Sequence, residues 1–250
     1  VITIAPKRRG LNDSRFRHRR KNCDLRLRAV KNLAHSALGF LGKGLRIMAS
    51  NDNFRPTLLV GVGGTGSKFA ELILEQAIEN DSSVKGRIGI MALDTDDNDM
   101  KALKHVPTRS RIRFSEPETV YRLLERNTDV EDKWSYRRTD PEMSQDILGM
   151  TLIEGAGQIR MLTRLALHDA FVNKALLDKF EAAIAELAVH SDDQAYDGAV
   201  HILIVGSMAG ATGSGSFAQV ALALKHAARA RGSKATVRGI FLLPDVYARS

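Results

Sequence analysis

The stretch Gly206-Ser-Met-Ala-Gly-Ala-Thr-Gly-Ser-Gly-Ser216 decides how this chain folds. An apolar run at residues 200–205 (VHILIV) precedes it, and a helical pattern follows from residue 217 to about residue 231. A turn of small residues between a buried strand and a helix leaves backbone N–H groups free and directs the positive end of the helix outward. The pattern predicts an anion-binding site, and phosphate is the anion that such turns commonly hold.

A second unit of the same kind lies earlier in the chain. Residues 57–62 (TLLVGV) form a short apolar run, the turn Gly63-Gly-Thr-Gly-Ser67 follows, and apolar side chains then recur at helical spacing as far as Ile78. Residues 88–93 (IGIMAL) form a second apolar run that ends in the acidic loop Asp94-Thr-Asp-Asp-Asn-Asp99. A strand, a helix and a second strand in this order predict a parallel pair joined by a right-handed crossover.

Strand and helix patterns alternate through the rest of the chain. The expected helices are 117–126, 141–148, 159–171 and 176–189, and the further expected strands are 112–114 and 236–243. A third loop of small residues, 149–157, lies between two of these helices. This alternation indicates an α/β fold, a doubly wound and mostly parallel sheet with helices on both faces. The three loops and the acidic segment should gather near the carboxyl ends of the strands, where open α/β sheets bind ligands.

The positive charge of the sequence is concentrated at its beginning. The chain has 37 basic and 29 acidic residues, and residues 1–47 hold 13 of the basic ones but only Asp13 and Asp24 of the acidic ones. Residues 48–250 therefore hold 24 basic and 27 acidic residues, a net charge of −3. We expect residues 48–250 to form one nucleotide-binding domain, and we do not expect this folded part to bind nucleic acid.

Residues 1–47 are expected to be a disordered basic arm. Three interpretations stay open: a basic tail for nucleic acid or a membrane surface, an arginine-rich transit segment, or an over-extended start. The third is favoured because Met48 is the first methionine and leads directly into the first strand.

Composition excludes several classes of protein. The single cysteine, Cys23, allows neither a disulfide framework nor a cysteine zinc site, and it favours a reducing, cytoplasmic compartment. No window has the about 18 uninterrupted apolar residues of a membrane span. The seven histidines are scattered without a His-Glu-x-x-His pair, so neither protein-held metal nor catalytic residues are predicted from them.

The first glycine-rich turn is compatible with several nucleotide-binding folds. Gly61-Val-Gly-Gly-Thr-Gly66 satisfies G-x-G-x-x-G between a strand and a helix, and Ser67 and Lys68 could add a hydroxyl group and a positive charge. A Walker A loop is excluded, because Gly66 is followed by Ser-Lys and the later loop has no lysine. A dinucleotide-binding Rossmann fold would place an acid such as Asp94 on the ribose, but it leaves the stretch at 209–215 unexplained.

The loops taken together resemble the tubulin/FtsZ superfamily. Ala209-Gly-Ala-Thr-Gly-Ser-Gly215 matches its signature [G/A]-G-[G/A]-T-G-[S/T]-G without a mismatch. The turn at 61–67, the loop at 92–96, the stretch at 155–164 and the segment at 243–246 resemble the family's other nucleotide loops in the same order. The resemblance covers about residues 57–246, and divergent bacterial tubulin-like proteins are more similar than tubulin or FtsZ. Two departures stand out: Asp94 and Lys68 occupy positions where such sequences usually carry asparagine.

The resemblance implies GTP or GDP as ligand, with Mg2+, and association into a homo-oligomer or head-to-tail filament. The implied nucleotide contacts are Gly63, Gly64, Thr65, Gly66, Ser67, Lys68, Asp94, Asp96, Gly155, Ala156, Gly157, Gln158, Gly210, Ala211, Thr212, Gly213, Ser214, Gly215 and Asp245. In that superfamily a central helix supplies base contacts and the loop after it supplies the acids for hydrolysis. Both would fall beyond Ser250, so we expect nucleotide binding here, and GTP hydrolysis only with that second half.

Two other classes of enzyme stay open on the residues alone. An ATP-dependent adenylating enzyme of the E1/ThiF type would suit the turn at 61–67 followed by Asp94 and Asp96, although Cys23 lies outside the expected domain. An NAD-dependent oxidoreductase would suit the same turn and Asp94. Either enzyme should prefer ATP or NAD to GTP.

Overall fold

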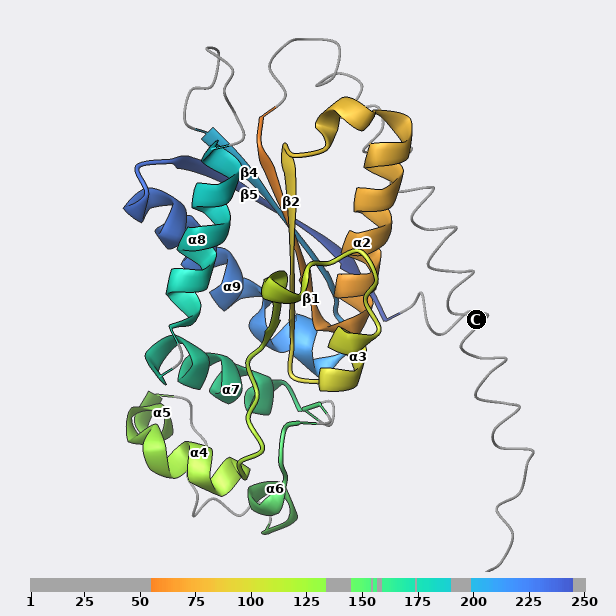
Figure 1. The fold of residues 1–250 in the computed structure, drawn as a ribbon. Helices are drawn as coiled ribbons and strands as arrows, with labels where there is room; N and C mark the ends of the chain where they lie inside the picture. The colour runs from red at the N-terminus through yellow and green to blue at the C-terminus, as the bar shows by residue number, and fades with distance from the viewer. Residues whose placement is uncertain are drawn as a thin grey trace, which may run out of the picture.

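The computed structural model describes residues 55–133, 145–153, 155–156, 159–173, 175–189 and 199–244. Its centre is a five-stranded sheet in the order β3-β2-β1-β4-β5, and every pair of neighbouring strands is parallel (Figure 1). The strands are β1 (Thr57–Val62), β2 (Ile88–Asp94), β3 (Arg111–Arg113), β4 (Ala199–Ser207) and β5 (Lys234–Leu242). The predicted doubly wound α/β sheet is confirmed. The basic arm predicted at residues 1–47 lies outside the described residues.

Helices cover both faces of the sheet (Figure 1). On one face α2 (Gly63–Asn80) and α3 (Asp97–Lys101) enclose a small core around Phe69, Leu59 and Val205. On the other face α7 (Arg160–Asn173), α8 (Leu176–Val189) and α9 (Ala211–Ala230) enclose a larger core. Alternate residues of β1 enter opposite cores, as the period of two in a strand requires.

Short helices extend the second core beyond the carboxyl ends of the strands. These are α4 (Val120–Arg126), α5 (Thr128–Lys133) and α6 (Gln145–Gly149), which lie with α7 at the bottom of Figure 1. No helix was predicted between residues 126 and 141, and α5 forms in the first part of that interval. The expected helix at 117–126 begins only at Val120, because Thr119 caps it by accepting the N–H of Arg122 at 3.4 Å.

Two predicted loops are the first turns of helices. Helix α2 begins at Gly63 and α9 begins at Ala211, although the sequence led us to expect helices only after Ser67 and from residue 217. The glycines of these two stretches therefore lie mostly within helices, where the lack of a side chain allows close packing. The predicted strands at 57–62 and 88–93 agree with β1 and with all but the last residue of β2.

Candidate functional site

The N-termini of the two longest described helices meet at the carboxyl edge of the sheet. Helix α2 leaves β1 and α9 leaves β4, and these two strands are neighbours in the sheet. From β1 the chain crosses through α2 to β2, and from β4 it crosses through α9 to β5, which lies in the opposite direction along the sheet. The gap between β1 and β4 is therefore the topological switch point at which open α/β sheets bind ligands. A Cβ added to Gly63, whose φ is +78°, would lie 3.2 Å from the backbone nitrogen of Gly213. The first turns of α2 and α9 therefore touch.

Neither of these helices is capped by its own side chains. Val62 precedes α2 and Gly210 precedes α9, and neither helix has a side-chain cap or an acidic residue in its first turn. The short helix α3, by contrast, is capped by Asp96, whose Oδ1 accepts the N–H of Asn98 at 2.8 Å. The free N–H groups and the positive ends of both helix dipoles thus point to one place, a geometry suited to an anion.

Glycine is required where these first turns press against the sheet. A Cβ on Gly66 would lie 2.3 Å from the carbonyl oxygen of Val205, and one on Gly213 would lie 2.6 Å from that of Ser207. Contacts this short with backbone cannot be relieved by moving a side chain. Of the other predicted contacts in these turns, Gly64, Thr65, Thr212, Ser214 and Gly215 are half-buried, Ala211 is buried, and Gly210 is exposed.

A family model described as tubulin-like matches residues 58–250. The chain belongs to the tubulin-like family. This agrees with the resemblance predicted from the glycine-rich turns. No curated protein matches the sequence.

Two archaeal structures are similar to this tubulin-like chain. One is the GDP-bound monomer of CetZ1 from Haloferax volcanii, at 18% identity and a TM-score of 0.42, over 76% of this chain and 44% of that one. The other is CetZ from Methanosaeta thermophila, at 18% identity and a TM-score of 0.43, over 76% of this chain and 37% of that one. The tubulin-like chain thus spans less than half the length of either structure.

Asp94 is a buried acid at the same edge of the sheet. It ends β2 with 2% of its surface exposed, and its Oδ1 accepts the N–H of Thr95 at 2.7 Å and that of Asp96 at 3.3 Å. Its Oδ2 has no hydrogen-bond partner among the described residues. Burial raises the pKa of Asp94 to about 6, and the negative charge of Asp99 adds to the rise. The two N–H groups and the nearby Thr212 hydroxyl oppose it.

A threonine pair joins the acidic loop to the signature. Thr95 is fully buried, and its Oγ1 lies 3.3 Å from Oγ1 of Thr212. This contact brings residues 117 positions apart to the same edge of the sheet. Sequence reasoning missed Thr95, although it stands between two residues that were singled out.

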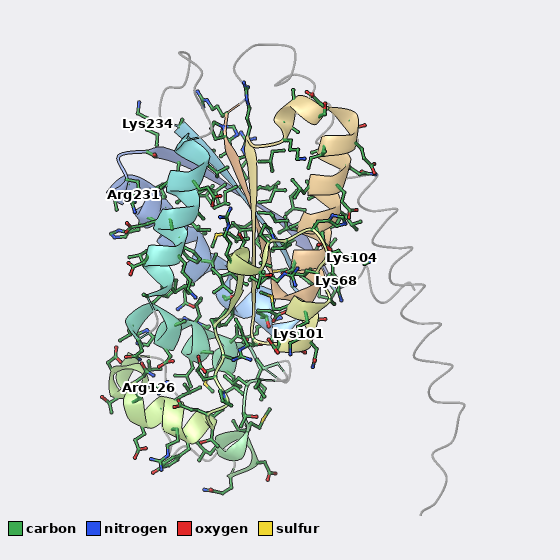
Figure 2. All side chains as sticks on the ribbon, viewed as in Figure 1. Lys68, Lys101, Lys104, Arg126, Arg231 and Lys234 are labelled. Atoms are coloured by element: carbon green, nitrogen blue, oxygen red, sulfur yellow. The ribbon has the colours of Figure 1, made fainter. Side chains whose placement is uncertain are left out.

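Lys68 does not point freely into the site. Its Nζ lies 3.3 Å from Oδ1 of Asp99 on α3, and both side chains are about half exposed. Figure 2 shows Lys68 and Lys101 on the side of α2 and α3. Ser67 has its hydroxyl buried without a partner in the described part of the chain. Asp99 was not singled out from the sequence.

Arg160 ties the third loop to the signature. From the start of α7, its Nε donates to Oγ of Ser214 at 2.9 Å. Two described residues of the third loop precede Arg160 in the chain: Gly155, whose φ is +100°, and Ala156, which is buried. The predicted contacts Gly157, Gln158 and Asp245 lie outside the described residues. Arg160 lies in a stretch matched to the family but was not named as a contact, because its reach to Ser214 depends on the packing of α7 on α9.

Within the described ranges, no three His, Cys, Asp or Glu side chains are grouped to hold a metal ion. None of the helices in those ranges is both long enough and apolar enough to cross a bilayer.

Proposed function

We propose that this tubulin-like chain binds a guanine nucleotide, GTP or GDP, with its phosphates at the joined N-termini of α2 and α9. The observation that carries the proposal is that both helices, uncapped and free of first-turn acids, start side by side at the switch point of the sheet. Membership of the tubulin-like family favours guanine over adenine nucleotides. The earlier alternatives, an adenylating enzyme and an oxidoreductase, lose support from the same match.

Backbone groups of both helices and of the third loop would surround the phosphates. Backbone N–H groups at Gly64, Thr65, Thr212 and Gly213 would surround the phosphates, and Arg160 would hold Ser214 in place from α7. Gly155 and Ala156, with Gly157 and Gln158, would close the site from the third loop.

Asp94 and Asp96 fit a Mg2+ ion held with the phosphates. An orphaned, buried Oδ2 on Asp94 and a half-buried carboxylate on Asp96 lie at this edge. Mg2+ is commonly held by one or two carboxylates, waters and phosphate oxygens, so a full protein cage is not required. When bound, the ion would supply neutralising charge to the phosphates. Asp245 would add a further carboxylate.

The proposal also includes assembly of the chain, which follows from family membership. Family membership favours a homo-oligomer or head-to-tail filament in the cytoplasm, with nucleotide at the contact between subunits. The described residues hold no group that we assign to hydrolysis. Sedimentation of the protein with and without GTP tests assembly, and sediment that does not depend on nucleotide would contradict it.

Thr65→Asp should weaken GTP and GDP binding about tenfold to a hundredfold. The new carboxylate would stand in the first turn of α2, where it repels phosphate. The same carboxylate favours the helix dipole, so the variant should melt no lower than the unchanged protein. Titration calorimetry in Mg2+ measures the binding, and thermal melting measures the stability.

Thr65→Asn is the matched control for this experiment. It has the size of aspartate without the charge, so its nucleotide affinity should stay close to that of the unchanged protein. Competition with ATP and NAD+ separates the nucleotide classes. Wild-type affinity in Thr65→Asp, or preference for ATP or NAD+, would overturn the proposed function.

A further inference from the structure

A carboxylate from another helix lies against the first turn of α2. A Cβ added to Gly64 would lie 1.8 Å from Oδ2 and 2.4 Å from Cγ of Asp99, so this side chain rests directly on the first turn of α2. Its other oxygen, Oδ1, lies 3.3 Å from Nζ of Lys68. Helix α2 has no acidic residue of its own in that turn. Asp99 thus lies against the first turn of α2 and beside the ammonium group of Lys68, which is 31 residues away in sequence.

We propose that Asp99 competes with the nucleotide phosphates for the first turn of α2 and for Lys68, and thereby sets the affinity of the site. The inference rests on the proposed function, because it assigns a competitor to the same phosphate position. A carboxylate and a phosphate are both anions that favour a helix N-terminus and an ammonium group. They cannot use the same Cα surface of Gly64 at once.

The contact is built to be displaced. The Asp99 and Lys68 side chains are 42% and 49% exposed, and ion pairs with that much access to water are weak. A phosphate carries more charge than a carboxylate and accepts more hydrogen bonds. When it binds, Lys68 can exchange Asp99 for phosphate, while Asp99 turns toward solvent.

Charge also makes Asp99 unfavourable once phosphate is present. Asp94, which is buried and has its Oδ2 without a partner among the described residues, already places one carboxylate at this edge. Two carboxylates at one edge therefore oppose an incoming anion unless a cation compensates them. Lys68 neutralises Asp99 in the described structure, and it must give up that pair before it can serve the phosphate.

Asp99→Asn should bind GDP about three- to tenfold more tightly than the unchanged protein, because the substitution removes the negative charge that competes with the phosphates. The measurement is titration calorimetry in EDTA, so that no divalent cation bridges a carboxylate to phosphate. The gain should shrink as salt is raised from 20 to about 300 mM, because screening weakens charge repulsion between exposed groups. A structural defect would lower affinity, so a gain in affinity is a readout that a merely structural role does not produce.

Asp97→Asn is the matched control on the same short helix. Asp97 pairs with Lys101 at 2.5 Å and with Arg113 at 3.7 Å, whereas the three atoms nearest to a Cβ on Gly64 all belong to Asp99. It removes the same charge two residues away, and we expect its GDP affinity to change less than twofold.

The outcomes separate this inference from the proposed function. An unchanged or weaker affinity in Asp99→Asn, or an equal gain in Asp97→Asn, would overturn the role of Asp99 while guanine nucleotide binding stands. If the unchanged protein binds no guanine nucleotide even in Mg2+, the proposed function fails, and the role of Asp99 fails with it.

Discussion

Asp94→Asn should stabilise the nucleotide-free, metal-free protein by about 2 kcal/mol at pH 8 and by almost nothing at pH 4. Asp94 is 2% exposed, and burial raises its pKa from an ordinary value of 3.8 to about 6. A rise of this size corresponds to about 3 kcal/mol against the charged form. The new Asn Nδ2 takes the place of the orphaned Oδ2 and itself has no partner, which costs about 1 kcal/mol.

The direction with pH follows from where the proton is held more tightly. Because the folded chain binds the Asp94 proton more tightly than the unfolded chain, this carboxyl favours folding most below pH 3.8. Its contribution falls as the pH rises from 3.8 to about 6 and stays low above that. Asparagine does not titrate, so the substitution removes this dependence. The two backbone N–H groups that now donate to Oδ1 of Asp94 can donate to the amide oxygen instead.

Urea unfolding of both proteins at pH 4, 6 and 8, in EDTA, measures the effect. Asp96→Asn is the control, because it removes a carboxylate two residues along and keeps an oxygen to cap α3. This variant should not show the gain in stability between pH 4 and pH 8 that we expect of Asp94→Asn. A stability difference for Asp94→Asn that does not grow between pH 4 and pH 8 would contradict the assignment of the burial cost to Asp94.

The same substitution bears on the departure seen in the sequence. The tubulin/FtsZ resemblance implies asparagine at this position, and the chain carries a buried acid beside the proposed phosphates. A residue that lowers stability at neutral pH is expected where function requires it. The charge on Asp94 therefore supports the Mg2+ assignment at that edge, since a cation would relieve the burial cost and the repulsion of phosphate together.

Much of the fold was predictable because its strands are buried on both faces. Residues 57–62 and 88–93 are continuous apolar runs, the form that a central parallel strand takes, and both were placed correctly. The helix at 176–189 was placed to the residue, because its apolar side chains recur at helical spacing. Leu176, Phe180, Ile184 and Leu187 carry this spacing, and all four enter the core.

The beginnings of α2 and α9 were misplaced for a physical reason. Glycine disfavours helix on its own, so Gly63-Gly-Thr-Gly66 and Gly210 to Gly215 were interpreted as loops. Tertiary packing overrides that preference, because only glycine allows Gly66 and Gly213 to approach the backbone of β4. The turns were still found as sites, since the same glycines that permit the approach leave the N–H groups exposed to a ligand.

The long-range contacts of the site could not be predicted from local pattern. The Lys68–Asp99 pair and the Thr95–Thr212 contact join segments 31 and 117 residues apart. Each depends on how α3 and α9 are placed by the sheet, and a single sequence carries no signal of that placement. The helical region between β3 and α7 was difficult for a similar reason, because Arg126 on α4 pairs with Asp169 on α7, 43 residues away.

Asp169→Ala should destabilise the protein by about 3–5 kcal/mol, because it removes the fully buried carboxylate that Arg126, Asn127 and Asn173 share as acceptor. Asp169 on α7 is fully buried and accepts Nε and Nη2 of Arg126 at 2.8 and 2.9 Å. It also accepts Nδ2 of Asn127 at 3.0 Å and Nδ2 of Asn173 at 2.8 Å. Figure 2 shows Arg126 beside α4, from which it reaches α7. The substitution leaves several donors without their shared acceptor.

Arg122→Ala is the matched control, and the comparison links stability to the site. Arg122 also lies on α4, but its pair with Glu125 at 2.7 Å is mostly exposed, so its loss should cost less than about 0.5 kcal/mol. Urea unfolding at pH 7 measures both variants, and an Asp169→Ala cost no larger than that of Arg122→Ala would contradict the role of the buried carboxylate.

Helix α7 runs from Asp169 back to Arg160, roughly 14 Å at its usual rise. Because Arg160 donates to Ser214, a loosened α7 should also lower the protection of the Ser214 region against hydrogen exchange, and Arg122→Ala should leave that protection unchanged.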